Sequence, residues 1–460
     1  MIAAVALTLT LAAAPTLAPG AFAYPIHRRA LDNGLSVVFV PYDSPGLAAF
    51  FTMFRVGSRN EVEPGRSGFA HFFEHLSFRG TRNRSGEEWE HATKTLGLDT
   101  NASTDDDVTF YWLAGPSSAL PQVIDLEADR FMNLAYGEDD FKVESRAVLG
   151  ELLKSLANPD FKVQEAARDL AFTRHSYEHT TIGFERDVRD MPTGYHYSLE
   201  LYRRFYRPDN AVVIVVGDFD EERTFERIRA AYGPWKGKGE TAKVPAEPPQ
   251  TKAREAHFGW PSPILPRLWS GWHTPGAADL DATAAQLVLW PYLFAQPSRL
   301  YRELVYDRRL VEEIGGDWQP HRDPYLFGYE LVLKSAAAEA PARLAVDRAL
   351  ADLAGGEVDA AWLADVKSNV RASVVMMTDT PYRAGVWLVY YTALTGDPGY
   401  LDAVMARVAA VGPQDLAAFA KRWLVPENRT TVTVASGATK AAGPQGGATP
   451  NPARAAGATR

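Results

Sequence analysis

A short motif that occurs twice constrains the fold of this chain more than any other feature of the sequence. Residues 205–210 read Phe-Tyr-Arg-Pro-Asp-Asn and lead into the apolar run 211–216. Residues 423–428 read Trp-Leu-Val-Pro-Glu-Asn and lead into the β-branched run 430–434, and the prolines of the two copies are 218 positions apart. Common turn residues explain one such match on their own. Because each copy lies near the end of one half of the chain, we favour an internal duplication.

The length of the chain also requires more than one domain. With 460 residues it exceeds what one ordinary hydrophobic core supports. Hydrophobic residues make up 46% and charged residues 23%, which is the balance of a globular protein. Residues 236–252 are rich in Lys, Gly, Pro and Glu and are typical of a linker. We therefore expect an N-terminal domain over 24–235, a C-terminal domain over 253–435 and a disordered tail over 436–460.

The first residues have the composition of a secretory signal. Residues 1–23 carry no charged side chain and end in Ala21-Phe22-Ala23, a small-x-small cleavage pattern. No Lys or Arg precedes the apolar stretch, so a weak anchor is the alternative. Pro15 and Pro19 argue against a regular spanning helix. We predict a cleaved signal peptide, a periplasmic location and no stable membrane anchor.

The absence of cysteine and the net charge exclude several classes of protein. A chain with no Cys has no disulfides, no thiolate metal site and no cysteine nucleophile, so His and carboxylates must hold any metal. The formal net charge is −9. An acidic protein is a poor candidate for binding phosphate backbones, and we expect no nucleic-acid partner.

Hydrophobic periodicity predicts helices and strands mixed along the first half. The expected strands cover residues 35–41, 48–56, 108–113 and 211–216. The expected helices cover residues 69–78, 89–96, 120–134 and 141–156. A second pattern of the same mixed kind follows from residue 253 to residue 434.

The strongest chemical signal is His71-Phe-Phe-Glu74-His75. On a helix, positions i, i+3 and i+4 share one face, so the three polar side chains converge. Two imidazoles one turn apart can bind one zinc ion. The glutamate between them then serves as general base, taking a proton from water and delivering it to the leaving amine.

The same His-x-x-Glu-His spacing recurs at His175–His179, so context must separate the copies. The first copy lies in an apolar segment bounded by Gly68 and Gly80. The second runs into Thr-Thr-Ile-Gly, which is poor helix material. We predict a loop there, without convergent side chains.

A catalytic zinc ion usually has three protein ligands and one open position. The predicted helix 141–156 offers Glu144 and Glu151, seven residues apart and therefore on one face. Either can be an ordinary surface residue of a helix. The residues alone do not choose between them.

The segment 68–81 around the first motif resembles the pitrilysin-like peptidases (M16 family, M16B type), which carry the inverted zinc motif. Residues 101–104, Asn-Ala-Ser-Thr, and 109–111, Thr-Phe-Tyr, are similar to the edge strand beside the metal in that family. The resemblance implies an α+β fold with two related halves. Each half is a mostly antiparallel β-sheet covered by helices, and the two form half of a clamshell.

The resemblance also assigns roles to individual residues. Glu151 follows His75 by 76 residues, as the third ligand does in the family, and Glu144 matches a second Glu that supports catalysis. Asn101 and Ala102 lie where a peptide substrate adds as an extra strand. The implied activity is peptide hydrolysis with one Zn2+ per chain.

One departure from the family pattern concerns an Arg and a Tyr in the second half that help to bind substrate. Val305 and Glu312 occupy the two positions here. Arg299 and Tyr306 have the right separation, but Arg299 already matches a preceding element, so we treat that pair as coincidence. We predict the catalytic subunit of a heterodimer, whose homologous partner lacks zinc and supplies Arg and Tyr. The alternative is a non-catalytic scaffold or peptide-binding subunit of the same fold.

Two further clusters receive ordinary structural interpretations. Asp105-Asp106-Asp107 is predicted to be a solvated loop. Trp387, Tyr390 and Tyr391 have helical spacing and are expected in a core or an interface.

Overall fold

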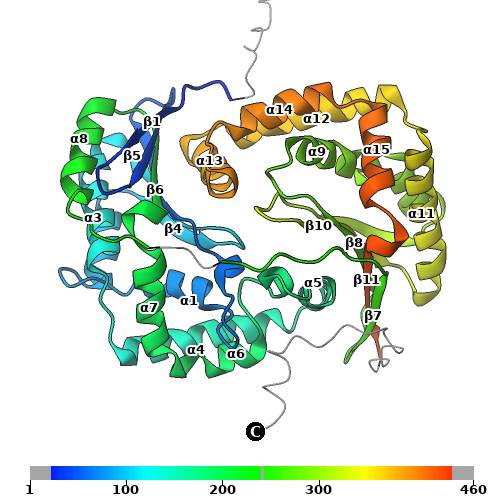
Figure 1. Cartoon of the computed structure of the whole chain (residues 1–460), viewed down its shortest axis with the longest axis horizontal. Helices are drawn as coiled ribbons and strands as arrows, with labels where there is room; N and C mark the ends of the chain where they lie inside the picture. Colours follow the sequence, from blue (N-terminus) through cyan, green and yellow to red (C-terminus); the bar gives the residue numbers. More distant parts are fainter. Residues whose placement is uncertain (1–21, 240–242, 438–460) are drawn as a thin grey trace, which may run out of the picture.

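The computed structural model describes residues 22–239 and 243–437 (Figure 1). Residues 438–460 of the predicted tail and almost all of the predicted signal peptide lie outside the described residues. The predicted start of the tail is one residue too early, because Ser436 still belongs to the last strand of the second sheet. The predicted helices and strands of the first half are all present, with ends shifted by at most three residues. One such shift is in the helix after Ser85, because Ser85 and Glu88 form a capping box that starts the helix at Gly86.

The first half contains a six-stranded sheet in the order β1-β2-β6-β3-β5-β4. Its neighbours are antiparallel except for β2 and β6, which are parallel. The strands are β1 (His27–Ala30), β2 (Ser36–Pro41), β3 (Leu47–Phe54), β4 (Asp99–Thr104), β5 (Thr109–Pro116) and β6 (Ala211–Gly217).

The second half repeats this topology. Its five-stranded sheet has the order β7-β11-β8-β10-β9, again antiparallel except for one parallel pair, β7 and β11. Strand β1 alone has no counterpart among the described residues. The strands are β7 (Arg254–Trp260), β8 (Arg267–Thr274), β9 (Val311–Asp317), β10 (Tyr325–Leu333) and β11 (Arg429–Ser436).

The repeated sequence motif has the same local structure in both halves. Each copy forms a single 3-10 turn, Pro208–Asn210 and Pro426–Asn428, directly before the interior strand β6 or β11. The side-chain amide of Asn210 donates a 2.9 Å hydrogen bond to the Phe205 carbonyl. The side-chain amide of Asn428 donates a 2.8 Å hydrogen bond to the carbonyl of Trp423, five residues back as in the first copy. The α+β fold class with two related halves is confirmed.

Helices cover both sheets (Figure 1). Those of the first half are α1 (Phe69–Leu76), α2 (Gly86–Thr95), α3 (Leu120–Asn133), α4 (Glu138–Ser155), α5 (Pro159–Ala171), α6 (Glu185–Asp190), α7 (Tyr195–Phe205) and α8 (Glu221–Tyr232). Those of the second half are α9 (Leu280–Phe294), α10 (Arg299–Tyr301), α11 (Glu339–Gly355), α12 (Ala360–Met377), α13 (Pro381–Thr395), α14 (Tyr400–Ala410) and α15 (Pro413–Trp423).

The two halves exchange one helix each. Helix α5 packs against β8 and β11 of the second sheet, and α13 packs against β3 and β6 of the first. Strand β3 is therefore buried on both faces. Phe50 and Phe54 enter the core under the helices of their own half, whereas Phe51 and Met53 enter the core that α13 shares. The exchange explains why β3 is a continuous apolar run rather than an alternating one.

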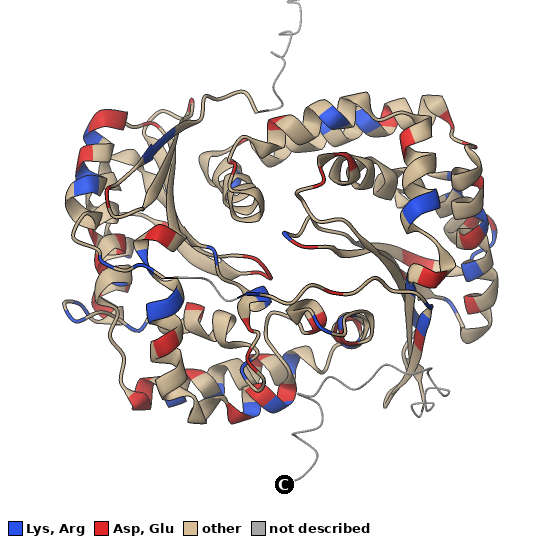
Figure 2. Ribbon diagram, in the orientation of Figure 1, with Lys and Arg blue, Asp and Glu red and all other residues tan. Residues whose placement is uncertain are grey.

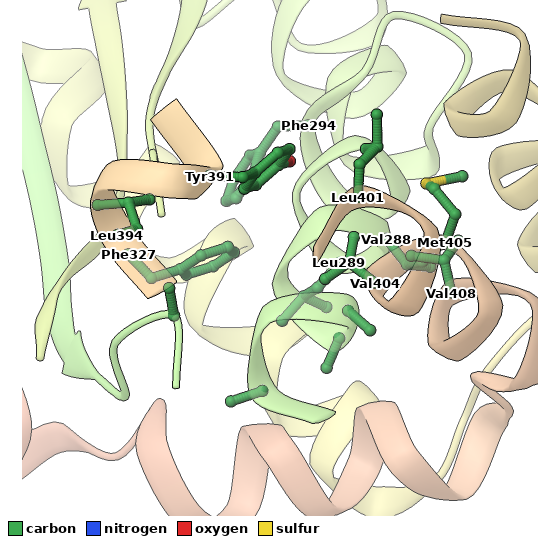
Figure 3. Close-up of a cluster of buried hydrophobic side chains, with 14 of the residues drawn as sticks. Val288, Leu289, Phe294, Phe327, Tyr391, Leu394, Leu401, Val404, Met405 and Val408 are labelled. Atoms are coloured by element: carbon green, nitrogen blue, oxygen red, sulfur yellow. The ribbon is translucent and has the colours of Figure 1, made fainter. Parts of the chain in front are cut away.

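Helix α13 also contributes to the core of its own half. Figure 3 shows Tyr391 and Leu394 of α13 near Phe294 and Phe327, beside side chains from α9 and α14. Tyr391 is buried, and the ring of Tyr390 lies 5.7 Å from that of Phe110 in the first half. The predicted core or interface role of this aromatic cluster is confirmed. No helix in the described part of the chain is both long enough and apolar enough to cross a bilayer.

Candidate active site

Helix α1 carries the first His-x-x-Glu-His motif, and its two faces have different environments. Phe72 and Phe73 are fully buried. The Phe73 ring lies 4.3 Å from that of Tyr206 and 5.7 Å from that of Tyr202, so α7 and the residue that follows it pack on this face of the helix. The opposite face presents the three polar residues of the motif, as the spacing predicts.

A buried carboxylate that the sequence analysis missed holds the N-terminus of α1. Glu61 accepts hydrogen bonds from the amides of Gly68 (2.7 Å) and Ala70 (2.5 Å). Burial raises the pKa of Glu61 well above its usual range, and the two amide hydrogen bonds oppose that shift. Gly68 has a φ of 86°, and a Cβ there would lie 2.4 Å from the carbonyl oxygen of Ile182. No local pattern relates Glu61 to the helix, because the chain reaches it through an irregular loop.

Three potential metal ligands converge beside α1. Glu151 Oε2 on α4 lies 3.6 Å from His71 Nε2 and 3.7 Å from His75 Nε2. Ligands about 2.0–2.1 Å from a tetrahedral zinc ion are separated by ~3.4 Å, which is close to both His–Glu distances. The ligand atoms of all three residues lie within 4.8 Å of one another. The Glu151 side chain is 49% exposed. The cluster is therefore accessible from outside, as a site for an exchangeable molecule requires.

Glu144, one helical repeat before Glu151, lies on the other side of the His75 ring. Its Oε2 is 3.3 Å from His75 Nδ1, and its other oxygen pairs with Arg79. Glu144 is almost fully buried. A carboxylate at Nδ1 orients the ring and fixes its tautomer, leaving Nε2 for a metal. Arg79 was not predicted, although it lies only four residues after His75.

The surroundings of His71 disfavour its charged form, chiefly through burial. Burial, together with the nearby His75, lowers the pKa of His71 to about 4. Its Nδ1 is buried without a hydrogen-bond partner among the described residues. A neutral imidazole has a free lone pair, which is the form that binds a metal.

Glu74 is held in place by the last residue of β4. Thr104 Oγ1 donates a 2.5 Å hydrogen bond to Glu74 Oε2. Burial raises the pKa of Glu74, and the hydrogen bond from Thr104 partly offsets that shift. A carboxylate with a raised pKa accepts a proton more readily at neutral pH. Thr104 was noted only as part of a strand in the sequence, not as a partner of Glu74.

Asn101 and Ala102 lie on β4, the edge strand of the first sheet. Within the described residues β4 pairs only with β5, so its other edge is open to an added strand. Asn101 is exposed, and its side-chain oxygen accepts a 2.9 Å hydrogen bond from the amide of Ala102. Strand β4 packs beside α1, which brings this open edge close to the histidines.

The second copy of the motif has no convergent geometry, as predicted. Residues Ser176–Glu178 form a single 3-10 turn. His175 Nδ1 accepts a hydrogen bond from the Tyr177 amide, and its Nε2 lies 2.9 Å from Asp323 Oδ2. His179 Nδ1 lies 3.0 Å from the carbonyl oxygen of Thr180. The two histidines therefore serve separate structural contacts.

The prediction of a solvated loop at residues 105–107 is wrong. Asp106 is 1% exposed and Asp107 is 7% exposed. Asp106 accepts hydrogen bonds from Ser58 and from Arg168, and its Oδ2 lies 2.9 Å from His321 Nε2. Burial alone would raise the pKa of Asp106, but the cationic neighbours hold it well below its usual range. The covering groups come from distant parts of the sequence, which explains the error.

The two residues at the family's Arg and Tyr positions differ from the family's residue types and have different surroundings. Val305 packs partly against the second core, and Glu312 on β9 pairs with Lys334 at 2.6 Å. Arg299 has a side chain that is 93% exposed, and Tyr306 Oη accepts a hydrogen bond from Gln296.

Comparison with known proteins identifies the family. The family model described as Insulinase (Peptidase family M16) matches residues 47–184, and the one described as Peptidase M16 inactive domain matches residues 198–370. The zinc protease PqqE of Helicobacter pylori is 31% identical over 293 residues, which cover 62% of this chain and 64% of that protein. An uncharacterized zinc protease of Streptomyces coelicolor is 29% identical over 45% of this chain and 44% of its own length. The matched region thus spans less than two thirds of these curated relatives.

Solved structures share the whole fold. A protease from H. pylori superimposes with a TM-score of 0.84 at 27% identity, covering 90% of this chain and 99% of that one. An M16-like peptidase from Alicyclobacillus acidocaldarius gives a TM-score of 0.79 at 19% identity, covering 90% of this chain and 99% of that chain, which shows the fold alone. With two matching domain models, zinc protease relatives and a converging His-His-Glu cluster, the chain belongs to the pitrilysin-like M16 peptidase family.

Proposed function

We propose that the protein is a zinc-dependent endopeptidase in which His71, His75 and Glu151 hold one zinc ion and Glu74 is the general base. The observation that carries the proposal is the convergence of both Nε2 atoms on Glu151 Oε2, at 3.6 and 3.7 Å. Glu74 lies on the same helix face and is oriented by Thr104. Two histidines and two glutamates gathered around an accessible point are more typical of a functional site than of a purely structural contact.

The chain's own residues have separate roles in the proposed reaction. Zinc, when bound, supplies a Lewis acid that acidifies water and polarises a carbonyl group. Glu74 Oε1 or Oε2 takes the proton from the attacking water and delivers it to the amine of the leaving peptide. Glu144 is a positioning residue, because it acts on the reaction through the His75 ring that it contacts.

The open edge of β4 supports binding of an extended peptide. The substrate adds as a further strand along Asn101 and Ala102, where main-chain hydrogen bonds give affinity without a strict side-chain requirement. This arrangement places a peptide bond near Glu74, because Thr104 of the same strand contacts that carboxylate.

We further propose that a homologous subunit without zinc completes the site. Val305 and Glu312 stand where family members carry Arg and Tyr, and the Glu312 carboxylate is already paired with Lys334. A periplasmic location follows from the composition of residues 1–23. A non-catalytic scaffold or peptide-binding subunit remains the competing function, and it predicts no hydrolysis under any condition.

The test combines zinc content with hydrolysis of a fluorogenic peptide. The mature chain and its Glu74→Gln variant are compared, alone and with a homologous protein encoded beside it. Hydrolysis by the wild type but not by the variant supports the proposed enzyme. A zinc-loaded wild type without hydrolysis in either setting would leave the peptide-binding alternative.

A further inference from the structure

The second half of the chain contacts the region of the candidate active site through a polar network that is mostly buried. The loop between β9 and β10 meets the turn between β4 and β5, which occupies the equivalent place in the first half. Figure 2 shows charged segments at this meeting point between the two sheets. The members of this inter-half network are Arg59, Asp106, Asp107, Tyr177, His321 and Asp323.

One arm, or branch, of the inter-half network ends at Asp106, in the turn that follows β4. His321 Nε2 lies 2.9 Å from Asp106 Oδ2, and its Nδ1 lies 2.8 Å from the Gln319 carbonyl oxygen. Both partners are acceptors, so both ring nitrogens donate and His321 is an imidazolium. Asp106 is two residues from Thr104, whose hydroxyl holds Glu74. The first arm thus runs from the second half to the proposed general base.

The other arm ends on α1. Arg59 Nε donates a 2.6 Å hydrogen bond to Asp323 Oδ2, which also faces His175 Nε2. Arg59 belongs to the 3-10 turn Ser58–Asn60, which leads directly into Glu61. Glu61 in turn accepts the first amides of α1, the helix that carries the zinc motif.

Backbone hydrogen bonds join the two arms at residues 58–59 and 105–106. The amides of Ser58 and Arg59 donate to the carbonyl oxygens of Asp105 (3.3 Å) and Asp106 (2.8 Å). A Cβ at Gly57 would lie only 2.2 Å from the Asp105 carbonyl oxygen, so the two backbones are in direct contact. Any shift of one segment is therefore passed to the other.

We infer that His321 and Asp323 of the second half are positioning residues for Glu74, acting through Asp106–Thr104 and through Arg59–Glu61. The inference rests on the proposed function. It gives the half without metal ligands a defined role: to keep β4 and the start of α1 at the separation that the Thr104–Glu74 hydrogen bond requires. Displacement of a catalytic group by about 1 Å can cost on the order of 100-fold in rate.

The variants Asp323→Ala and His321→Gln each remove one arm, and Asp323→Asn keeps one acceptor as a conservative rescue. Arg254→Ala is the matched control. Arg254 on β7 also crosses between the halves, bonding the carbonyls of Leu170 and Ala171, but it touches neither arm. All variants are compared with wild type for zinc content, KM and kcat, in the presence of the partner subunit if activity requires it.

The expected result is a kcat lower by roughly 10- to 100-fold for Asp323→Ala and His321→Gln, with zinc content and KM unchanged. Asp323→Asn recovers part of the loss, and Arg254→Ala keeps the wild-type kcat. A double-mutant cycle with Thr104→Val separates positioning from general stability. If His321 acts through Thr104, its substitution has little further effect once the Thr104 hydroxyl is gone. Equal kcat losses with and without that hydroxyl would overturn this arm of the inference.

Hydrogen–deuterium exchange provides a readout that does not depend on activity. Asp323→Ala and His321→Gln should speed exchange roughly tenfold or more in residues 57–70 and 99–108, and Arg254→Ala should not. Unchanged exchange in both segments would overturn the inference even if the enzyme is active. Faster exchange in a protein that hydrolyses no peptide would instead reject the proposed function while retaining the mechanical link.

Discussion

Glu144 and Glu151 lie on opposite sides of the His75 ring, Glu144 Oε2 at 3.3 Å from Nδ1 and Glu151 Oε2 at 3.7 Å from Nε2. The two glutamates are seven residues apart on α4 and are indistinguishable in the sequence pattern. The proposed function gives the two glutamates different roles, because a single imidazole can use one nitrogen for a metal and the other for an orienting carboxylate.

This relationship predicts different metal affinities for two matched variants. Glu144→Gln should weaken zinc binding by about 10- to 100-fold, since only the orientation of the His75 ring is affected. Glu151→Gln should weaken it further, because a ligand is lost. Competition with a chromogenic chelator measures both constants. If Glu151→Gln binds zinc as wild type does, the third ligand has been assigned wrongly.

The role of Glu74 predicts a variant that keeps the metal and loses the chemistry. Glu74→Gln should retain a full complement of zinc, since Glu74 is not among the converging ligands. Its kcat should fall by ~10²–10⁴-fold, the usual contribution of a positioned base. Steady-state hydrolysis and metal analysis on the same preparation check this. Loss of zinc together with activity would contradict the assignment.

The two copies of His-x-x-Glu-His predict opposite outcomes for the same substitution. His71→Ala should abolish stoichiometric zinc binding, whereas His175→Ala should retain it. The latter removes a contact to Asp323 and should lower stability by about 1–3 kcal/mol, the cost of leaving buried partners unsatisfied. Zinc content and urea denaturation distinguish the two. Zinc loss only in His175→Ala would mean that the second copy is the metal site.

The exchanged helix α13 predicts a strong effect of one small residue. A Cβ at Gly385 would lie 2.0 Å from the ring of Phe51, so Gly385→Ala overpacks the contact between the halves. We expect Gly385→Ala to lower the free energy of unfolding by about 1–3 kcal/mol. Gly355→Ala on α11 is the control, because no described residue beyond its chain neighbours and the backbone of its own helix lies within 4 Å of the methyl group that it adds, and helix propensity favours Ala. Thermal unfolding should show a lower midpoint for the first variant only.

The buried His273 at the contact between α5 and β8 predicts a pH-dependent stability. Burial lowers the pKa of His273 to about 4, opposed by the hydrogen bond of its Nε2 to the Ala171 carbonyl. The unfolded chain takes up the proton near pH ~6.5, so this residue's contribution to stability falls as the pH drops from about 6.5 to 4. The loss is on the order of 3 kcal/mol. Urea midpoints of wild type and His273→Gln at pH 7 and pH 5 measure it, and equal pH sensitivity of the two proteins would reject this assignment.

Local features of the fold were predictable because they depend on residues close in sequence. The face shared by His71, Glu74 and His75 follows from the geometry of one helical turn. The strands and helices of the first half follow from the spacing of apolar residues, and the repeated turn before β6 and β11 follows from its Pro-acid-Asn sequence. These are properties that the amino-acid sequence by itself determined.

Other features exist only because distant segments meet. Burial of Asp106 requires His321, 215 residues further along the chain, and Glu61 reaches the start of α1 through an irregular loop. The choice between Glu144 and Glu151 depends on which side of the His75 ring each one meets once α4 packs on α1. No periodicity encodes such contacts, because packing between elements, rather than the spacing along one of them, selects the partner of each side chain. The tertiary structure alone decided these contacts.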